Sequence, residues 1–243
     1  MAGKIARNAP ANRSRKITYG CPLPELHTTN LPGKLFVVEG ADGSGRSTHI
    51  RLLSEWLESN GHAVEHMGLR RSPLLANDIE QAKQTNILTH TTMSLFYATD
   101  FFDQLVHEII PALRAGYVVL ADRYIYTLMA RDIVRGSSPE WTQNLYSPAL
   151  IPDAVCYLSV EPKQLVLRNF EKSASLDYWE SGMDLGLSRD MFDSFLQFQQ
   201  LLQAEFTRMQ KRYGFEIINA NRNVPSVQKA LRTHLGRILG ISA

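Results

Sequence analysis

A glycine-rich stretch at residues 40–47, GADGSGRS, constrains the fold of this chain more than any other feature. It matches the phosphate-binding pattern G-x-x-x-x-G-K-[ST], except that Arg46 stands in place of the lysine. An apolar run at 34–39 precedes it and a run with helical spacing at 47–59 follows it, so we expect a strand, a loop and a helix in that order. Glycines in such a loop let backbone N–H groups surround a polyphosphate at the positive end of the helix. The stretch therefore predicts a nucleotide-phosphate site.

Strand-like and helix-like patterns alternate after this point. The predicted strands span 34–39, 63–67, 117–121, 154–160 and 215–218, and the predicted helices span 46–60, 92–115, 123–135, 162–171, 189–212 and 224–239. Short apolar runs bounded by charge or proline are typical of parallel strands that are covered on both faces. This alternation predicts an α/β fold with a doubly wound, five-stranded parallel sheet flanked by helices, whose ligands bind beyond the carboxyl ends of the strands.

Two segments depart from this alternation. Residues 1–33 are rich in basic residues and then in prolines, and we expect a partly disordered basic arm and a linker there, with an arm that contacts phosphate or RNA as the alternative. Residues 34–243 are expected to form the domain. Within it, 172–188 combines small residues, glycines and mixed charge between two predicted helices. We interpret this segment as a lid, because phosphoryl-transfer sites must exclude water.

Composition limits the possible partners and compartment. With 243 residues and a net charge of +2, the chain can bury one substantial core, and its charge indicates no nucleic-acid partner. Its two cysteines lie far apart, and Cys156 falls in a predicted strand, where we expect a core residue. This usage favours the cytoplasm. No apolar run reaches the length of a membrane span, so we expect no membrane partner.

A second motif, Asp122-Arg123, follows the apolar run 118–121. A carboxylate at the tip of a buried strand can hold Mg²⁺ directly or through water, and the adjacent arginine can bind a phosphate with two hydrogen bonds. Ser47 occupies the hydroxyl position that coordinates Mg²⁺ in phosphate loops. A structural ion pair at the strand end is the alternative for Asp122-Arg123 alone. Together with the phosphate loop, the motif points to two phosphate-bearing substrates and a metal.

Several segments together resemble the thymidylate kinase family, in that family's order and spacing. They are residues 39–48, 95–100, 110–113, 122–124 and 152–158, and the resemblance covers about 34–240. It implies transfer of the γ-phosphate of ATP, with Mg²⁺, to a nucleoside monophosphate acceptor, dTMP by default. Family members are commonly homodimers, so the resemblance also implies a homodimer. An apolar stripe could form its interface or belong to the core; the stripe consists of Phe192, Phe195, Phe198, Leu202 and Phe206.

The resemblance also implies roles for individual residues. The ATP-binding set is Gly40, Ala41, Asp42, Gly43, Ser44, Gly45, Arg46, Ser47 and Thr48. The acceptor-binding set is Asp42, Arg70, Arg71, Tyr97, Phe101, Arg123, Thr127, Arg131 and Glu180, with Arg70 and Arg71 as alternatives for one phosphate-binding arginine of the family. The catalytic set is Arg46, Asp42, Asp122 and Arg123, with Ser47 and Asp122 at the metal. Tyr97 matches an aromatic that stacks on the base, although helix packing is an alternative for it.

The sequence departs from the family on the side of the base. Phe101 stands where the family usually has an arginine that reads thymine, and Leu128 and Arg131 replace polar or aromatic base contacts. Arg131 could supply a new donor or be an exposed helix arginine. These changes leave open a kinase for another nucleotide or nucleoside acceptor.

The lid departs as well, because Tyr178 replaces the family's arginine and Lys172 is the segment's only cation. An arginine that stabilises the transferred phosphoryl group can contribute about 10³–10⁵ in rate. We therefore hypothesise that Arg46 is the working catalytic cation, since a guanidinium can bridge two phosphate oxygens. The alternative is a catalytically weakened, nucleotide-binding regulator.

Overall fold

The computed structural model describes residues 16–69, 71–85, 88–173 and 176–241 of the chain. Its centre is one sheet of five parallel strands in the order β2-β3-β1-β4-β5, which confirms the predicted fold class. The strands are β1 (Lys34–Gly40), β2 (Val64–Gly68), β3 (Val118–Asp122), β4 (Ala154–Ser159) and β5 (Glu216–Asn219). Because β1 lies between β3 and β4, the strand order reverses there. That reversal places a ligand crevice beyond the end of β1.

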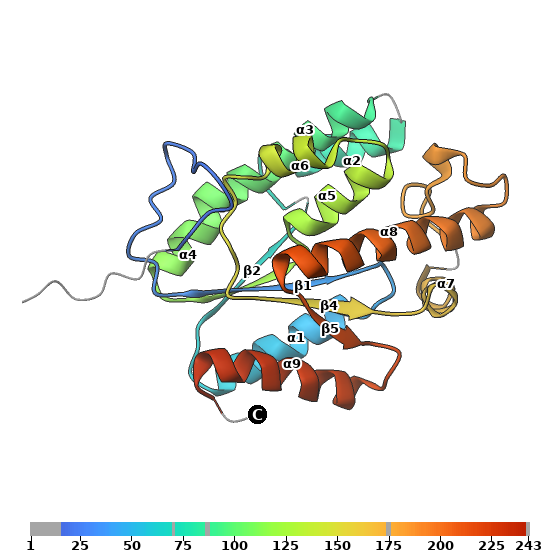
Figure 1. The fold of residues 1–243 in the computed structure, drawn as a ribbon. Coiled ribbons are helices and arrows are strands. Elements are labelled where there is room, and N and C mark those ends of the chain that lie inside the picture. The colour runs from blue at the N-terminus through green and yellow to red at the C-terminus, as the bar shows by residue number, and fades with distance from the viewer. Residues whose placement is uncertain (1–15, 70, 86–87, 174–175, 242–243) are drawn as a thin grey trace, which may run out of the picture.

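Helices cover both faces of the sheet (Figure 1). Alternate side chains of β1 serve the two faces: Phe36 and Val38 pack toward α1 (Arg46–Ser59) and α9 (Val224–Leu239), whereas Leu35 and Val37 pack toward the opposite helical layer. That opposite layer contains α3 (His90–Gln104), α4 (Ile110–Arg114), α5 (Ile125–Val134) and α8 (Met191–Tyr213). The burial of both faces explains why the strands read as continuous apolar runs.

The predicted helix 92–115 is one continuous helical stretch that changes form in its middle. A π-helical turn, η1 (Leu105–Ile109), joins α3 to α4. Pro111 lies two residues after this turn, and a proline offers no N–H to the carbonyl four residues before it. A wide turn at this point is consistent with that missing hydrogen bond.

Four further helices complete the described structure. They are α2 (Ala76–Thr85), α6 (Pro139–Leu145), α7 (Pro162–Ser173) and the 3₁₀ turn η2 (Met183–Leu185). Neither α2 nor α6 was predicted. The lid segment is more structured than we expected, because α7 extends into it, η2 lies within it and Ser181 is fully buried. No helix among the described residues is long and apolar enough to cross a membrane.

The chain before β1 packs against the domain. We call residues 16–33 the strap; residues 1–15 of the expected arm lie outside the described residues. Thr18 forms an antiparallel bridge with Leu150, and Leu26 and Leu31 are buried in the same core as α3 and α5. Lys16 forms an ion pair with Asp153. The strap is therefore part of the folded unit, although we expected a linker there.

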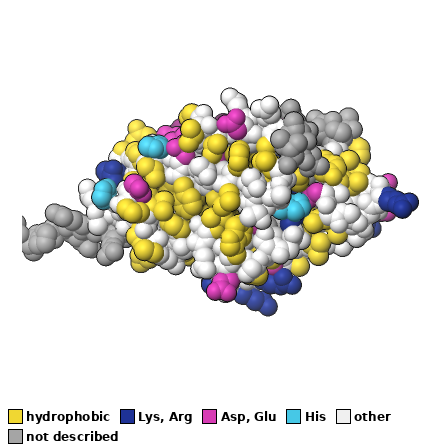
Figure 2. All heavy atoms as spheres, turned by 90° about the horizontal axis from the view of Figure 1, so that it is seen from above, with side chains coloured by type: hydrophobic (Ala, Val, Ile, Leu, Met, Phe, Trp, Pro, Cys, Tyr) yellow, Lys and Arg dark blue, Asp and Glu magenta, His cyan; other side chains and the backbone are white. Residues whose placement is uncertain are grey.

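The apolar stripe of α8 is mainly core. Phe195, Phe198, Leu202 and Phe206 are buried, whereas Phe192 is 42% exposed. The view onto the helical layer in Figure 2 shows apolar side chains spread over the surface among polar ones. Leu74 and Leu95 are among the exposed apolar residues of the chain. The stripe itself therefore offers little surface for an interface.

Candidate active site

The glycine-rich loop has the backbone shape that its sequence predicts. Gly43 and Gly45 have φ angles of 83° and 90°, in the left-handed region that favours glycine. Gly45 precedes α1 without any side-chain cap, so the first N–H groups of the helix remain available to an anion. Ser47 and Thr48 are exposed in the first turn. The loop can therefore receive a phosphate group.

Arg46 folds back over this loop and is only 9% exposed. Its Nε donates to Oδ1 of Asp122 at 2.7 Å, and its Nη2 donates to Oδ1 of Asp42 at 3.2 Å. Its Nη1 donates to the carbonyl oxygens of Gly40 and Ala41. The guanidinium thus joins the loop to the carboxylate at the tip of β3, and all three of its nitrogens are engaged.

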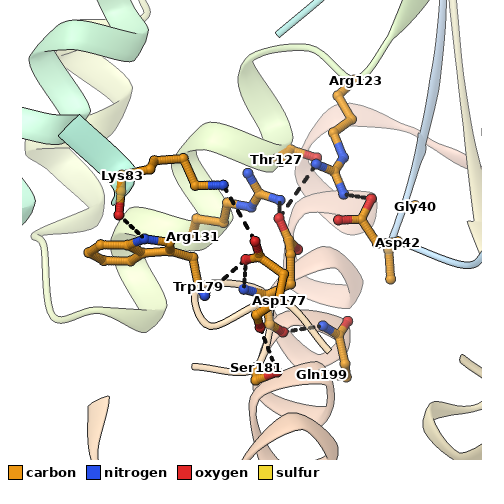
Figure 3. A network of polar contacts seen from close by, with 12 residues as sticks. Gly40, Asp42, Lys83, Arg123, Thr127, Arg131, Asp177, Trp179, Ser181 and Gln199 are labelled. Carbon is orange, nitrogen blue, oxygen red and sulfur yellow. Dashed lines mark hydrogen bonds and ion pairs between the residues drawn. The ribbon is translucent and has the colours of Figure 1, made fainter. Parts of the chain in front are cut away.

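Arg123 lies across the crevice from the loop. Its Nη2 donates to Oδ1 of Asp42 at 2.8 Å, as Figure 3 shows. Burial alone would raise the pKa of Asp42, but Arg123 and Arg46 outweigh it and hold that pKa well below its usual range. Asp42 is therefore a permanently charged acceptor between two guanidinium groups.

Glu39 fixes the backbone around Arg123 from below the crevice. Its fully buried carboxylate accepts from the backbone N–H groups of Tyr124 at 2.9 Å and Thr127 at 3.3 Å, and from the Thr127 hydroxyl. Arg123 itself has a φ of 72°, which is uncommon for a residue with a side chain. Burial raises the pKa of Glu39, and its hydrogen bonds lower it. The contact with Thr127 indicates a structural role for that hydroxyl.

A cavity between the loop and Arg123, which we call the acceptor cleft, is lined mostly by charged side chains. Its lining contains Asp42, Arg46, Gly68, Leu69, Arg71, Lys83, Tyr97, Asp122, Arg123, Arg131, Asp177 and Glu180. Four arginines and a lysine are a suitable environment for a phosphate. Arg70 lies outside the described residues, so its predicted role stays a prediction.

A second cavity, which we call the base cavity, adjoins the acceptor cleft and shares Lys83, Tyr97, Arg131 and Glu180 with it. Its other lining residues are His90, Met93, Ser94, Leu128, Asp132, Arg135, Tyr146 and Trp179. Tyr97 and Arg131 thus lie together beside the acceptor cleft. Phe101 does not line either cavity: it is fully buried and packs edge to face against Tyr124. The expected direct contact between Phe101 and the acceptor is therefore corrected to a packing role.

The lid segment closes over both cavities through the network in Figure 3. Glu180 accepts from Arg131 and lies 3.8 Å from Nη1 of Arg123. The indole Nε1 of Trp179 donates to the carbonyl oxygen of Lys83 on α2 at 3.2 Å. Arg131 is therefore a partly buried, ion-paired residue, and its interpretation as an exposed helix arginine is wrong.

The other end of the lid segment is held by Arg135, at the carboxyl end of α5. Its Nε and Nη2 donate to the two carboxylate oxygens of Asp184, at 2.7 and 3.2 Å. Its Nη2 also donates to the carbonyl oxygen of Trp179 at 3.0 Å, and its guanidinium lies 4.9 Å from the ring centre of Phe198. We call these contacts the Arg135 latch.

Sequence reasoning missed Lys83, Asp132, Arg135 and Trp179. Lys83 lies on α2, a short helix whose buried apolar residues, among those described, are Ile79 and Ala82. The one available signal was in α5, where Arg131 and Asp132 interrupt a run of apolar residues. A charged residue next to such a run is often a solvated helix end, and so the signal is weak.

Ser47 and Asp122 fit a magnesium ion only with help from other ligands. Both line one open cleft beside α1, and both offer the oxygen atoms that Mg²⁺ prefers. Within the described part of the chain, no group of three or more His, Cys, Asp or Glu side chains could hold a metal by itself. An ion here would need water or phosphate oxygens to complete its shell.

Comparison with known proteins gives a consistent result. The sequence model of the family described as thymidylate kinase matches residues 38–231. A probable thymidylate kinase 2 of Saccharolobus solfataricus is 34% identical over 210 residues, which cover 86% of this chain and 98% of that protein. A probable thymidylate kinase of Pyrococcus abyssi is 28% identical, covering 82% and 94% of the two chains. A thymidylate kinase of Brachyspira hyodysenteriae is 30% identical, covering 78% and 93%.

Proposed function

Because this chain belongs to the thymidylate kinase family, we propose that it transfers the γ-phosphate of ATP to dTMP, giving ADP and dTDP. One structural observation supports the proposal above the others. The phosphate loop faces a second cluster of cations across the acceptor cleft, and the base cavity continues from that cluster. Two phosphate-bearing molecules can therefore meet end to end, as phosphoryl transfer requires.

Different residues of the site would position the donor and the acceptor. The loop amides would hold the donor's phosphates, and Arg123, which Asp42 and Glu39 orient, would hold the phosphate of the acceptor. When bound, Mg²⁺ would neutralise phosphate charge, with Ser47 and Asp122 as its protein ligands. The transfer needs no covalent step on the protein.

Arg46 would supply the cation that a phosphate loop ordinarily takes from lysine. Its Nη1 contacts to the carbonyls of Gly40 and Ala41 are ones that phosphate oxygens could replace, while Nε keeps its bond to Asp122. The guanidinium could then bridge two phosphate oxygens while it stays anchored to the tip of β3. This geometry supports a catalytic role better than a regulatory one.

A coupled ADP-release assay with an acceptor panel tests the activity. We expect Mg²⁺-dependent turnover that is highest with dTMP and lower with dCMP, dGMP, dAMP and thymidine. Turnover highest on another acceptor would favour the alternative kinase. Absence of phosphoryl transfer to every acceptor, from protein that still binds ATP in a thermal-shift assay, would favour the regulator.

We also propose that the protein works as a cytoplasmic homodimer. Both cysteines, Cys21 and Cys156, are free, which suits a reducing compartment, and burial raises the pKa of Cys156 to about 12, so it is an inert core thiol. Light scattering coupled to size exclusion should give twice the mass of one chain. A monomer at micromolar concentration would contradict the dimer.

A further inference from the structure

The part of the lid segment that carries Glu180 is tied to two helices of the domain. Three consecutive carbonyl oxygens there, at residues 179–181, each accept a hydrogen bond from a different side chain. The pairs are Nη2 of Arg135 with Trp179 at 3.0 Å, Nε2 of Gln199 with Glu180 at 3.1 Å, and Oγ of Ser194 with Ser181 at 2.8 Å. Gln199 and Ser194 are buried residues of α8, and Figure 3 shows the Gln199 amide pointing to this turn. We call residues 179–181 the acid turn.

The N–H groups of the acid turn are paired as well. Asp177 accepts two of them at Oδ1, at 2.9 and 3.0 Å, and the third at its backbone oxygen, at 2.9 Å. Gly182 follows with a φ of 62°, and a Cβ at this position would lie 2.7 Å from the ring of Phe198 on α8. The chain therefore approaches α8 too closely for a side chain. Because each backbone N–H and carbonyl group of the acid turn has a partner within the protein, the turn needs no substrate to complete its hydrogen bonds.

The position of the acid turn determines where two cations of the acceptor cleft lie. The Glu180 carboxylate accepts from Arg131 and lies 3.8 Å from Nη1 of Arg123. Asp42 accepts from Nη2 of Arg123 at 2.8 Å, so that two carboxylates flank this guanidinium. Both arginines line the acceptor cleft. A shift of the turn would therefore release the two groups that face an acceptor phosphate, and small misplacements of such groups are costly.

We propose that Gln199 and Ser194 are positioning residues for the phosphoryl transfer. They hold the acid turn in its working position before a substrate binds, so that Glu180 keeps Arg131 and Arg123 ready for the phosphate of the acceptor. The acid turn is then a fixed wall of the acceptor cleft. The inference rests on the proposed function, because it concerns how the same site receives its acceptor.

Hydrogen–deuterium exchange of the wild type tests the fixed turn and needs no turnover. Without substrate, we expect the amides of residues 179–181 to exchange at least about 100-fold more slowly than in an unstructured peptide. Exchange at the unstructured rate, with protection only after dTMP and an ATP analogue are added, would show a turn that forms on binding and would overturn the inference. This result does not depend on whether the wild type phosphorylates dTMP, so the proposed function and the inference can fail separately.

Gln199→Met removes the amide donor and keeps the length of the side chain. We expect the KM for dTMP to rise about 5- to 10-fold, with kcat and the KM for ATP within about twofold of the wild type. Ser194→Ala should change the same constant in the same direction. The matched control is Gln203→Met, one turn later on α8, because Nε2 of Gln203 donates to the carbonyl oxygen of Val160, outside the lid segment, at 2.6 Å. The control should keep the wild-type KM for dTMP, and an equally normal KM in Gln199→Met would overturn the inference.

Glu180→Gln separates positioning from a merely structural role. Glutamine lacks the charge that holds the two arginines, while the backbone contacts of the acid turn remain, so this variant alone should raise the KM for dTMP. If Gln199 acts through Glu180, adding Gln199→Met to Glu180→Gln should change that KM by less than about twofold more. Effects of the two substitutions that multiply would show that Gln199 acts independently of Glu180, and the positioning role would be lost.

Discussion

At the scale of single residues, Arg46 binds its own loop and two carboxylates with one planar group. Removing it leaves Asp42 and Asp122 without that cation and the donor's phosphates without its charge. We expect Arg46→Ala to lower kcat by about 10³-fold or more, and Arg46→Lys to lie between that variant and the wild type, because it keeps the charge without the fork. The measurement is ADP release at saturating substrates.

A second arginine of the same helix controls for nonspecific effects of charge. Arg51 is exposed and pairs with Glu55 one turn away, so Arg51→Ala should keep turnover within about twofold of the wild type. Unchanged turnover in Arg46→Ala would remove the catalytic role that we give to this side chain.

Glu39 is a single residue that acts on the site from outside it, because it lines neither the acceptor cleft nor the base cavity. Glu39→Ala leaves the N–H groups of Tyr124 and Thr127 unpaired, so we expect a loss of about 2–4 kcal/mol in the free energy of unfolding. The KM for dTMP should rise more than the KM for ATP, because Arg123 loses its support. Urea denaturation and steady-state kinetics measure the two effects. Glu39→Gln, which keeps one acceptor oxygen, should lose less.

Asp132 makes stability depend on pH in a definite direction. Burial raises its pKa from about 3.8 to about 6, against the opposing effects of a hydrogen bond from Ser94 and the charges of Arg135 and Arg131. An acid whose pKa is higher in the folded state destabilises that state once it ionises. The loss of free energy of unfolding is therefore absent below about pH 4 and complete above about pH 6. We expect Asp132→Asn to raise the free energy of unfolding by about 1–3 kcal/mol at pH 7.5 and to leave it unchanged at pH 4. Urea titrations at the two pH values check this; equal effects at both would contradict it.

At the scale of elements, the strands were predictable because each is buried on both faces. The run from Val118 to Ala121 is short, apolar and bounded by polar residues, as such strands are, and all five predicted strands begin and end within one residue of the observed bounds. Helix α2 was missed because its sequence, ANDIEQAKQT, is mostly polar and has Ile79 as its one large apolar residue. Its position depends on contacts with α3 and the lid segment, which no local pattern encodes.

The same contrast applies to the site. The loop and Asp122-Arg123 were recognisable because each is a short contiguous segment whose residue types determine both its backbone shape and its chemistry. The base cavity was not, because it is assembled from Ser94, Asp132 and Tyr146, which come from three helices. Phe101 shows the opposite error: a position inferred from a motif, whose side chain turned out to pack in the core.

The Arg135 latch is a property of two elements, α5 and the lid segment. Lysine at this position keeps the charge but cannot grip both oxygens of Asp184 and the carbonyl of Trp179 together. We expect Arg135→Lys to raise the KM for dTMP about 10-fold, with little change in the KM for ATP, and to speed amide exchange across 176–188. Steady-state kinetics and hydrogen–deuterium exchange measure the two effects.

The control for the latch is Arg208→Lys on α8, because the Arg208 side chain is 75% exposed and forms its ion pair with Glu205, one turn away on the same helix. That variant should match the wild type in both measurements. If Arg135→Lys did so as well, the lid segment would be held by its other contacts alone.

At the scale of the whole molecule, the strap packs against the core of the domain. It buries Leu26 and Leu31 and ties Lys16 to Asp153, which in turn accepts from the backbone N–H of Leu35 on β1. We expect removal of residues 1–31 to lower the melting temperature by several degrees relative to removal of residues 1–15, because the longer deletion uncovers the core. Differential scanning calorimetry on the two truncated chains checks this. Equal melting temperatures would show that the strap contributes no stability.

Tyr146 links the strap to the base. Tyr146 is a lining residue of the base cavity and also of a second cleft, which Tyr19, Gly20 and Cys21 of the strap help to form. Those three residues precede the segment 38–231 that the family model matches. An inhibitor that filled the base cavity and extended past Tyr146 into the second cleft would therefore touch surface that the shared family sequence does not specify. It could distinguish this kinase from relatives that bind the same nucleotide.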